Sequence, residues 1–137
     1  MRSLPVNRLL MLQMGYCFCG IMYNVFSLLA QRNGQQAWAS TDAVQGVAVV
    51  AMYGLFLSTG LMRNLIPYRL LMAISVILFG YGGVIVHLLN ANQLELYQSV
   101  WTWAAAIIIN GFGLLLNLAA AAGWFLAGFS HQEKTGV

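Results

Sequence analysis

Two asparagines, Asn110 and Asn117, lie in the uncharged segment that runs from Val100 to Gly128. They are seven positions apart, about two helical turns, so a helix places both on one face with Trp103 and Trp124. A row of small residues lies beside them, at Ala106, Gly113 and Ala120. An amide that faces lipid leaves its donors and acceptors unpaired, which is costly. We therefore expect this face to contact protein or to line a polar cavity.

A second polar row runs along the apolar segment 9–30, where its members recur at spacings of four and three residues. This spacing is typical of one face of a helix. The members are Gln13, Cys17, Gly20, Asn24 and Ser27. Further small residues mark the segments 45–62 and 70–89, at Gly54, Gly80 and Gly83. Small residues let helices approach closely in a membrane and amides bond across the contact. Two interpretations stay open: the rows are packing seams, or they line a ligand site or a permeation path.

His87 is the one histidine inside the apolar segments, since His131 belongs to the polar tail. An ionisable residue at membrane depth is a candidate for proton or ligand handling. A haem held by two histidines within one chain is excluded, because two suitably placed histidines are needed. A haem with one histidine ligand, a quinone contact and a structural histidine all remain open for His87.

The sequence argues against most catalytic chemistries. The four apolar segments contain no Asp, Glu, Lys or Arg, so they hold no carboxylate for ion coupling and no base for a serine nucleophile. Cys17 and Cys19 are two positions apart and point away from each other on a helix, so they neither pair nor chelate one metal. The glycines at 80–83 lie within a helix-length run, which predicts close packing rather than an ion filter. We expect no enzyme activity, no metal and no bound cofactor.

These polar and small-residue rows require long helices to position them. The chain has 137 residues, of which 61% are hydrophobic and only 7% charged, far below the roughly 25% charged residues of soluble domains. A membrane span needs roughly 20 apolar helical residues. The sequence therefore predicts one membrane domain over 1–137, an all-α, up-down bundle of four transmembrane helices at about 9–30, 45–62, 70–89 and 99–127. A polar cytoplasmic tail is expected at 130–137.

The few charges predict the orientation of the chain. Five basic residues (Arg2, Arg8, Arg63, Arg69 and Lys134) fall on one side of the membrane and Arg32 alone on the other. Positive residues favour the cytoplasmic side. We therefore expect both termini inside, the segments 31–44 and 90–98 outside, and a bacterial inner membrane as the location. The expected interface anchors are Trp38, Tyr68, Trp101, Trp103 and Trp124.

Local signals mark the ends of some helices. Asn33 and Gly34 predict a turn, and Ser40, Thr41 or Asp42 is expected to cap the helix that begins after it. Pro67 is expected in a tight connection from Arg63 to Arg69.

These patterns support three functional hypotheses. The first is a non-catalytic accessory or assembly subunit that contacts other membrane subunits or copies of itself, because we expect Tyr16, Tyr23, Tyr53 and Gly60 on more than one side of their helices. The second is a small channel, carrier or lipid-handling protein that uses the polar row. The third is a redox subunit with haem or quinone near His87. The bilayer is a partner in all three, and the net charge of +3 is too small to predict nucleic-acid binding.

Overall fold

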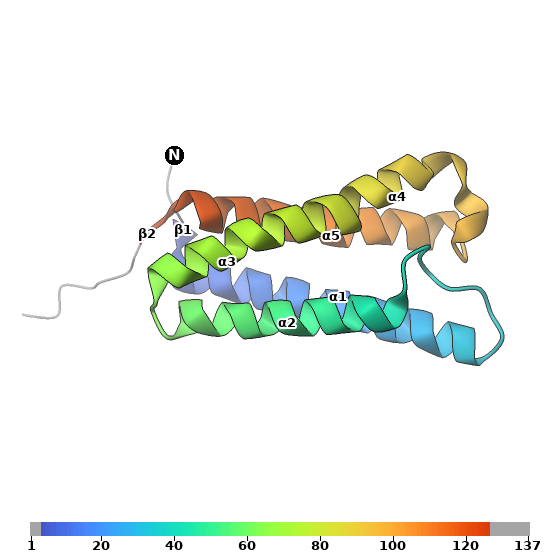
Figure 1. The fold of residues 1–137 in the computed structure, drawn as a ribbon, viewed down its shortest axis with the longest axis horizontal. Coiled ribbons are helices and arrows are strands. Elements are labelled where there is room, and N and C mark those ends of the chain that lie inside the picture. The colour runs from blue at the N-terminus through green and yellow to red at the C-terminus, as the bar shows by residue number, and fades with distance from the viewer. Residues whose placement is uncertain (1–3, 127–137) are drawn as a thin grey trace, which may run out of the picture.

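The computed structural model describes residues 4–126, and within them four helical segments are long and apolar enough to cross a membrane (Figure 1). Three are single helices: α1 (Val6–Arg32), α2 (Ala43–Leu61) and α5 (Val100–Ala122). The fourth, Leu65–Asn92, is composite and consists of α3 (Leu65–Leu78), the π-helix η1 (Phe79–Ile85), α4 (Val86–Leu89) and the 3₁₀ turn η2 (Asn90–Asn92). The predicted helical class and the number of helical segments long and apolar enough to span a membrane are confirmed. The expected tail at 130–137 lies outside the described residues.

The two ends of the helices differ in how the chain is tied together. At one end, which we call the strand-pair end, β1 (Leu4–Pro5) pairs in parallel with β2 (Phe125–Leu126). At the other, the loop end, the segment 33–42 bonds to the segment 90–99, which contains the 3₁₀ turn η3 (Leu94–Leu96). There the Gln98 N–H donates to the Ala37 carbonyl at 2.9 Å, and Gln36 bonds to the Glu95 carbonyl. Figure 1 shows the two connections side by side.

Local chemistry explains where the helices begin and end. Asp42 caps α2 by accepting from the Gln45 N–H at 2.8 Å, as one of the three predicted cap residues. Ser99 and Thr102 form a reciprocal capping box at the start of α5. The predicted turn after α1 is confirmed, with Gly34 at a φ of +73°. Gly123 ends α5 at a φ of +74°, a conformation that favours glycine.

Two boundary predictions are wrong. Pro67 lies in the first turn of α3, which begins at Leu65 instead of near 70. The first backbone N–H groups of a helix have no intrahelical partner, so a proline there loses no hydrogen bond. The last helix ends at Ala122 instead of 127, because Gly123 turns the chain. Trp124 therefore leaves the row that the spacing assigned to it.

The helices pack as two close pairs, α1 with α2 and α3 with α5, which also contact each other. Small residues lie at these contacts. Gly20 faces Val50, and Gly54 faces the Cys17 sulfur. Gly113 of α5 lies directly under the Tyr16 ring of α1, where a side chain of any size would clash. Gly80 has only ordinary contact distance to Leu114, and Ala120 is fully buried.

An aromatic cluster forms the middle of the core. Tyr16, Tyr53 and Phe79 meet edge to face with ring centroids 5.3–5.5 Å apart, and none is more than 5% exposed. Tyr23 and Gly60 are buried as well. The four residues that suggested outward-facing contact surfaces are thus all buried within this single chain.

Candidate functional site

The asparagines and the glutamine of the predicted polar rows separate into two groups. The first is a buried amide network near the strand-pair end, made of Gln13, Tyr53, Tyr68, Met72 and Asn117. The Asn117 Oδ1 accepts from Gln13 Nε2 at 3.0 Å and from the Tyr53 hydroxyl at 2.8 Å. The Tyr68 hydroxyl donates to Gln13 Oε1 at 2.5 Å. Its members come from α1, α2, α3 and α5, so the network joins all four helical segments. All five side chains are at most 1% exposed, so a ligand from outside cannot reach them.

Tyr68 was expected at the membrane interface, and that expectation is wrong. Its ring is fully buried, because α3 begins early and carries it into the bundle, where its hydroxyl meets Gln13. Within the network, Asn117 Nδ2 is the one fully enclosed side-chain polar atom of residues 4–126 without a hydrogen-bond partner. The network therefore fixes the register of the helices and leaves one donor unsatisfied.

Two further members of the polar row on α1 also have structural partners. The buried Ser27 hydroxyl accepts from the Trp38 N–H at 3.0 Å and so attaches the segment 33–42 to α1. The Cys17 sulfur lies 3.5 Å from the Val50 carbonyl of α2. Trp38 itself stacks on Phe26, with ring centroids 5.5 Å apart. These residues hold helices and loops together.

Asn24 and Asn110 form the second group, and each bonds to its own helix. Asn24 Nδ2 donates to the Gly20 carbonyl and Asn110 Nδ2 donates to the Ala106 carbonyl, both at 2.8 Å. Asn110 Oδ1 also accepts from the Tyr16 hydroxyl at 3.3 Å. Each Nδ2 carries a second hydrogen that no described residue accepts. The Asn117 Nδ2 is also unpaired but is enclosed in the network, whereas the Asn24 and Asn110 amides are only partly buried.

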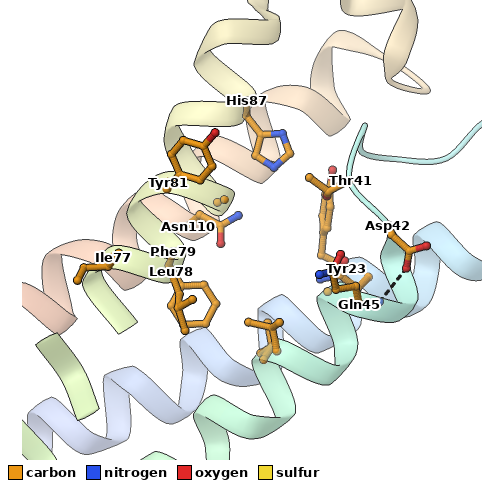
Figure 2. A pocket seen from close by; sticks show the side chains of 16 residues that line it. Tyr23, Thr41, Asp42, Gln45, Ile77, Leu78, Phe79, Tyr81, His87 and Asn110 are labelled. Atoms are coloured by element: carbon orange, nitrogen blue, oxygen red, sulfur yellow. Dashed lines mark hydrogen bonds between the residues drawn. The ribbon is translucent and has the colours of Figure 1, made fainter. Parts of the chain in front are cut away.

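Asn24 and Asn110 line one cavity, with a volume of about 430 Å³ (Figure 2). Ligand pockets usually measure roughly 300–1,000 Å³. The walls come from every span: Tyr23 and Asn24 of α1; Thr41, Asp42, Gln45, Gly46, Val49 and Val50 in and before α2; Ile77 and Leu78 of α3; Phe79, Tyr81, Gly82 and Gly83 of η1; His87 of α4; and Asn110 of α5. The structure thus brings three sequence-predicted candidates, Asn24, His87 and Asn110, to one site.

The π-helix η1 forms one wall of this cavity. A π turn holds more residues than an α turn, so it widens the helix and redirects the next helical segment; such turns are frequent at functional sites. Three of the seven residues of η1 are glycines. Gly83 lies against Asn110, and a Cβ there would come within 2.5 Å of its Oδ1. Beyond η1, α4 moves away from α2 towards the loop end (Figure 1).

The cavity is open at its side. Ile77 and Tyr81, which line it, are 72% and 65% exposed, and the α2 side of the opening carries the exposed Gln45. Its α1 side is closed by Gly46 of α2, which packs directly against the Asn24 amide. The exposed residues of its lining thus come from α2, its cap Asp42, α3 and η1.

His87 is fixed at the loop end of the cavity by a chain of hydrogen bonds. Asn90 Nδ2 donates to the Ser40 hydroxyl at 3.0 Å, and Ser40 donates to the Tyr97 hydroxyl at 3.1 Å. The Tyr97 oxygen lies 2.8 Å from His87 Nδ1. The other ring nitrogen, Nε2, has no partner among the described residues, although the ring is only 3% exposed. Figure 2 shows the His87 ring and the Asn110 amide pointing into the same space.

The remaining expected anchors lie in different surroundings. Trp101 and Trp124 are 78% and 69% exposed at opposite ends of α5, as a membrane-interface role requires. Trp103 is partly buried and donates from Nε1 to the His87 carbonyl at 2.8 Å, so it supports the cavity wall.

Sequence reasoning did not connect Tyr97, Thr41 or Gln45 with a site. Tyr97 lies in a connection, Thr41 entered only as a candidate helix cap, and Gln45 lies in the first turn of α2. Sequence reasoning also missed the π-helix, for which the three glycines between Phe79 and Ile85 were the available signal. No protein-family model, no curated protein and no solved structure matches this chain.

Proposed function

We propose that the chain is a non-catalytic membrane protein that binds one amphiphilic molecule at a time in the cavity between α2 and η1. One observation carries the proposal: a cavity of about 430 Å³ opens sideways through an apolar wall and ends at polar side chains that retain unused hydrogen-bonding groups. This proposal follows the second hypothesis from the sequence, in which a lipid-handling protein binds its ligand through the polar row.

The depth of the cavity supports an amphiphile. Asn110 lies ten residues into α5, about 15 Å along the helix at 1.5 Å per residue. The hydrocarbon core of a bilayer is about 30 Å thick. In a membrane-spanning bundle, the cavity would therefore reach from the loop end to about the middle of the bilayer. A lipid could place its polar part among His87, Asn24 and Asn110 while its apolar part leaves past Ile77 and Tyr81.

The same proposal includes the placement of the chain in the membrane. The helices cross in alternating directions, with the strand-pair end in the cytoplasm and the loop end outside. Arg8, Arg63 and Arg69 belong to the strand-pair end, whereas the loop end combines Arg32 with Asp42 and Glu95. This asymmetry agrees with the preference of positive residues for the inner side. A bacterial inner membrane is part of the proposal.

An accessory subunit is a weaker candidate. The tyrosines and the glycine that suggested outward contact surfaces are buried within the chain, so they give no reason to expect an external protein partner. The apolar residues that remain exposed, such as Leu55 and Ile108, are those that lipid contact alone requires.

Two glycine substitutions provide a matched test. Gly82 lines the cavity and Gly111 does not, and a side chain added at either position meets no atom within 4 Å. The Gly82→Phe variant should fill the cavity, whereas Gly111→Phe adds the same ring outside it. We expect native mass spectra of protein extracted in mild detergent to show one retained lipid on the wild type and on Gly111→Phe, and none on Gly82→Phe. Equal retention by all three proteins, or no retained lipid on the wild type, would overturn the proposal.

A further inference from the structure

We infer that the polar part of the ligand is an uncharged oxygen acceptor, so that the cavity selects a neutral lipid with a carbonyl group, of the quinone or diacylglycerol class. This inference rests on the proposed function and specifies its ligand. Its basis is the hydrogen-bonding direction of His87 and Asn110 and the charges around them.

His87 offers a donor to the cavity. Asn90 Nδ2 donates to the Ser40 hydroxyl, and Ser40 donates in turn to the Tyr97 oxygen. The Tyr97 hydroxyl then has its own proton free for His87 Nδ1, which lies 2.8 Å from its oxygen, and we assign to His87 the tautomer that accepts this proton. A neutral imidazole that accepts at Nδ1 carries its hydrogen on Nε2. The cavity therefore presents an Nε2–H at its loop end.

Asn110 offers a second donor. The Ala106 carbonyl can only accept, which identifies the amide atom beside it as Nδ2. One Nδ2 hydrogen is used there, and the Oδ1 is occupied by the Tyr16 hydroxyl. The hydrogen that remains on Nδ2 faces the same space as His87 (Figure 2). Two donors that converge on one space favour a ligand oxygen that accepts.

The charges exclude an anionic oxygen at this position. Among the described residues that line the cavity, none is a lysine or an arginine, and the carboxylate of Asp42 lies on the wall. A buried anion without a cationic partner is strongly disfavoured, and a nearby carboxylate disfavours it further. A carbonyl oxygen satisfies both donors without bringing a charge into the cavity.

Binding of three short-chain probes to the purified, delipidated full chain tests this inference. The probes are dioctanoylglycerol, decylubiquinone and dioctanoylphosphatidylglycerol, the last of which adds an anionic phosphate to the same acyl chains as the first. We expect at least one neutral probe to bind with one-to-one stoichiometry and about tenfold more tightly than the anionic probe. The neutral probe that binds identifies the source of the carbonyl group.

Variants of the two donors complete the test. His87→Leu and Asn110→Leu should each lower the affinity for the neutral probe about tenfold, which is the loss expected for one buried hydrogen bond. Asn117→Leu changes the same residue type on the same helix outside the cavity and should leave binding unchanged in the folded fraction. Asn110→Leu alone decides the outcome if His87→Leu does not fold.

Preferential binding of the anionic probe, or neutral binding that is unaffected by Asn110→Leu, would overturn the inference. If native mass spectra nevertheless show that Gly82→Phe loses the lipid that the wild type retains, the proposed function stands and only the ligand class is wrong. If Gly82→Phe retains the lipid, both proposals fail together.

Discussion

Replacing Tyr53 by Phe should destabilise the wild-type protein but stabilise a protein that already carries Asn117→Leu. Tyr53 is 1% exposed, and its hydroxyl has Asn117 Oδ1 as its partner, at 2.8 Å. In the wild type the substitution removes that hydrogen bond and leaves Asn117 Oδ1 paired with Gln13. Hydrogen bonds between membrane helices average about 0.6 kcal/mol and reach about 1.7 kcal/mol. The expected loss of unfolding free energy lies in this range.

The sign reverses once Asn117 is a leucine. The Tyr53 hydroxyl then stays buried without an acceptor, which costs about 1–3 kcal/mol. Removing it by Tyr53→Phe should therefore raise the unfolding free energy by about 1 kcal/mol or more. The two effects together give a coupling energy of about 2 kcal/mol between positions 53 and 117.

Reversible unfolding in mixed micelles, followed by circular dichroism as the fraction of denaturing detergent rises, measures all four proteins. Tyr81→Phe is the control, because the Tyr81 side chain is 65% exposed and should change the unfolding free energy little in either background. An equal destabilisation by Tyr53→Phe in both backgrounds would refute the buried amide network as the structure describes it.

Four further predictions concern packing, capping, the cavity and orientation. Gly113→Ala should destabilise the fold by about 1–3 kcal/mol, because the added methyl meets the Tyr16 ring; Gly111→Ala, where the space is open, should stabilise it by up to about 1 kcal/mol in the same unfolding assay. Asp42→Ala should lower the unfolding free energy by about 0.5–2 kcal/mol through loss of the cap at Gln45, and Asp42→Asn should retain most of it. Gly83→Ala should displace Asn110 and reduce lipid retention in native mass spectra, whereas Gly82→Ala should not. In a Cys17→Ala, Cys19→Ala background, an impermeant thiol reagent added to whole cells should label Gln36→Cys and spare Met62→Cys; the opposite pattern would reverse the proposed orientation.

The number and approximate position of the helices were predictable because apolar length is a property of the sequence alone, although two boundaries were wrong by about five residues. The turn at Gly34 and the cap before α2 were predictable because these residues act on their own neighbours, whereas the capping box of Ser99 and Thr102 was not predicted. The partners of the polar rows were not predictable in this way. Gln13 and Asn117 meet across 104 positions of sequence, and nothing in their spacing distinguishes them from Asn24 and Asn110.

The candidate site was predictable only in part. Asn24, His87 and Asn110 stood out because polar residues are rare at membrane depth. The cavity that joins them depends on the π-helix from Phe79 to Ile85. Within it Gly83 packs against Asn110, a tertiary contact that a helical period does not record. The burial of Tyr68 was not predictable for a similar reason, because it depends on where α3 begins.

Labelling with a lipid that carries a photoactivatable diazirine on its acyl chain tests the central claim most directly. Phe79 lines the cavity and is only 5% exposed, so a chain that stays outside the bundle cannot reach it, whereas Leu55 and Ile108 face outward at 72% and 69% exposure. Peptide mass spectrometry after irradiation in membranes should find label on Phe79 and Val49 in the wild type, reduced in Gly82→Phe and preserved in Gly111→Phe. Label confined to outward residues such as Leu55 and Ile108 in all three proteins would contradict the account.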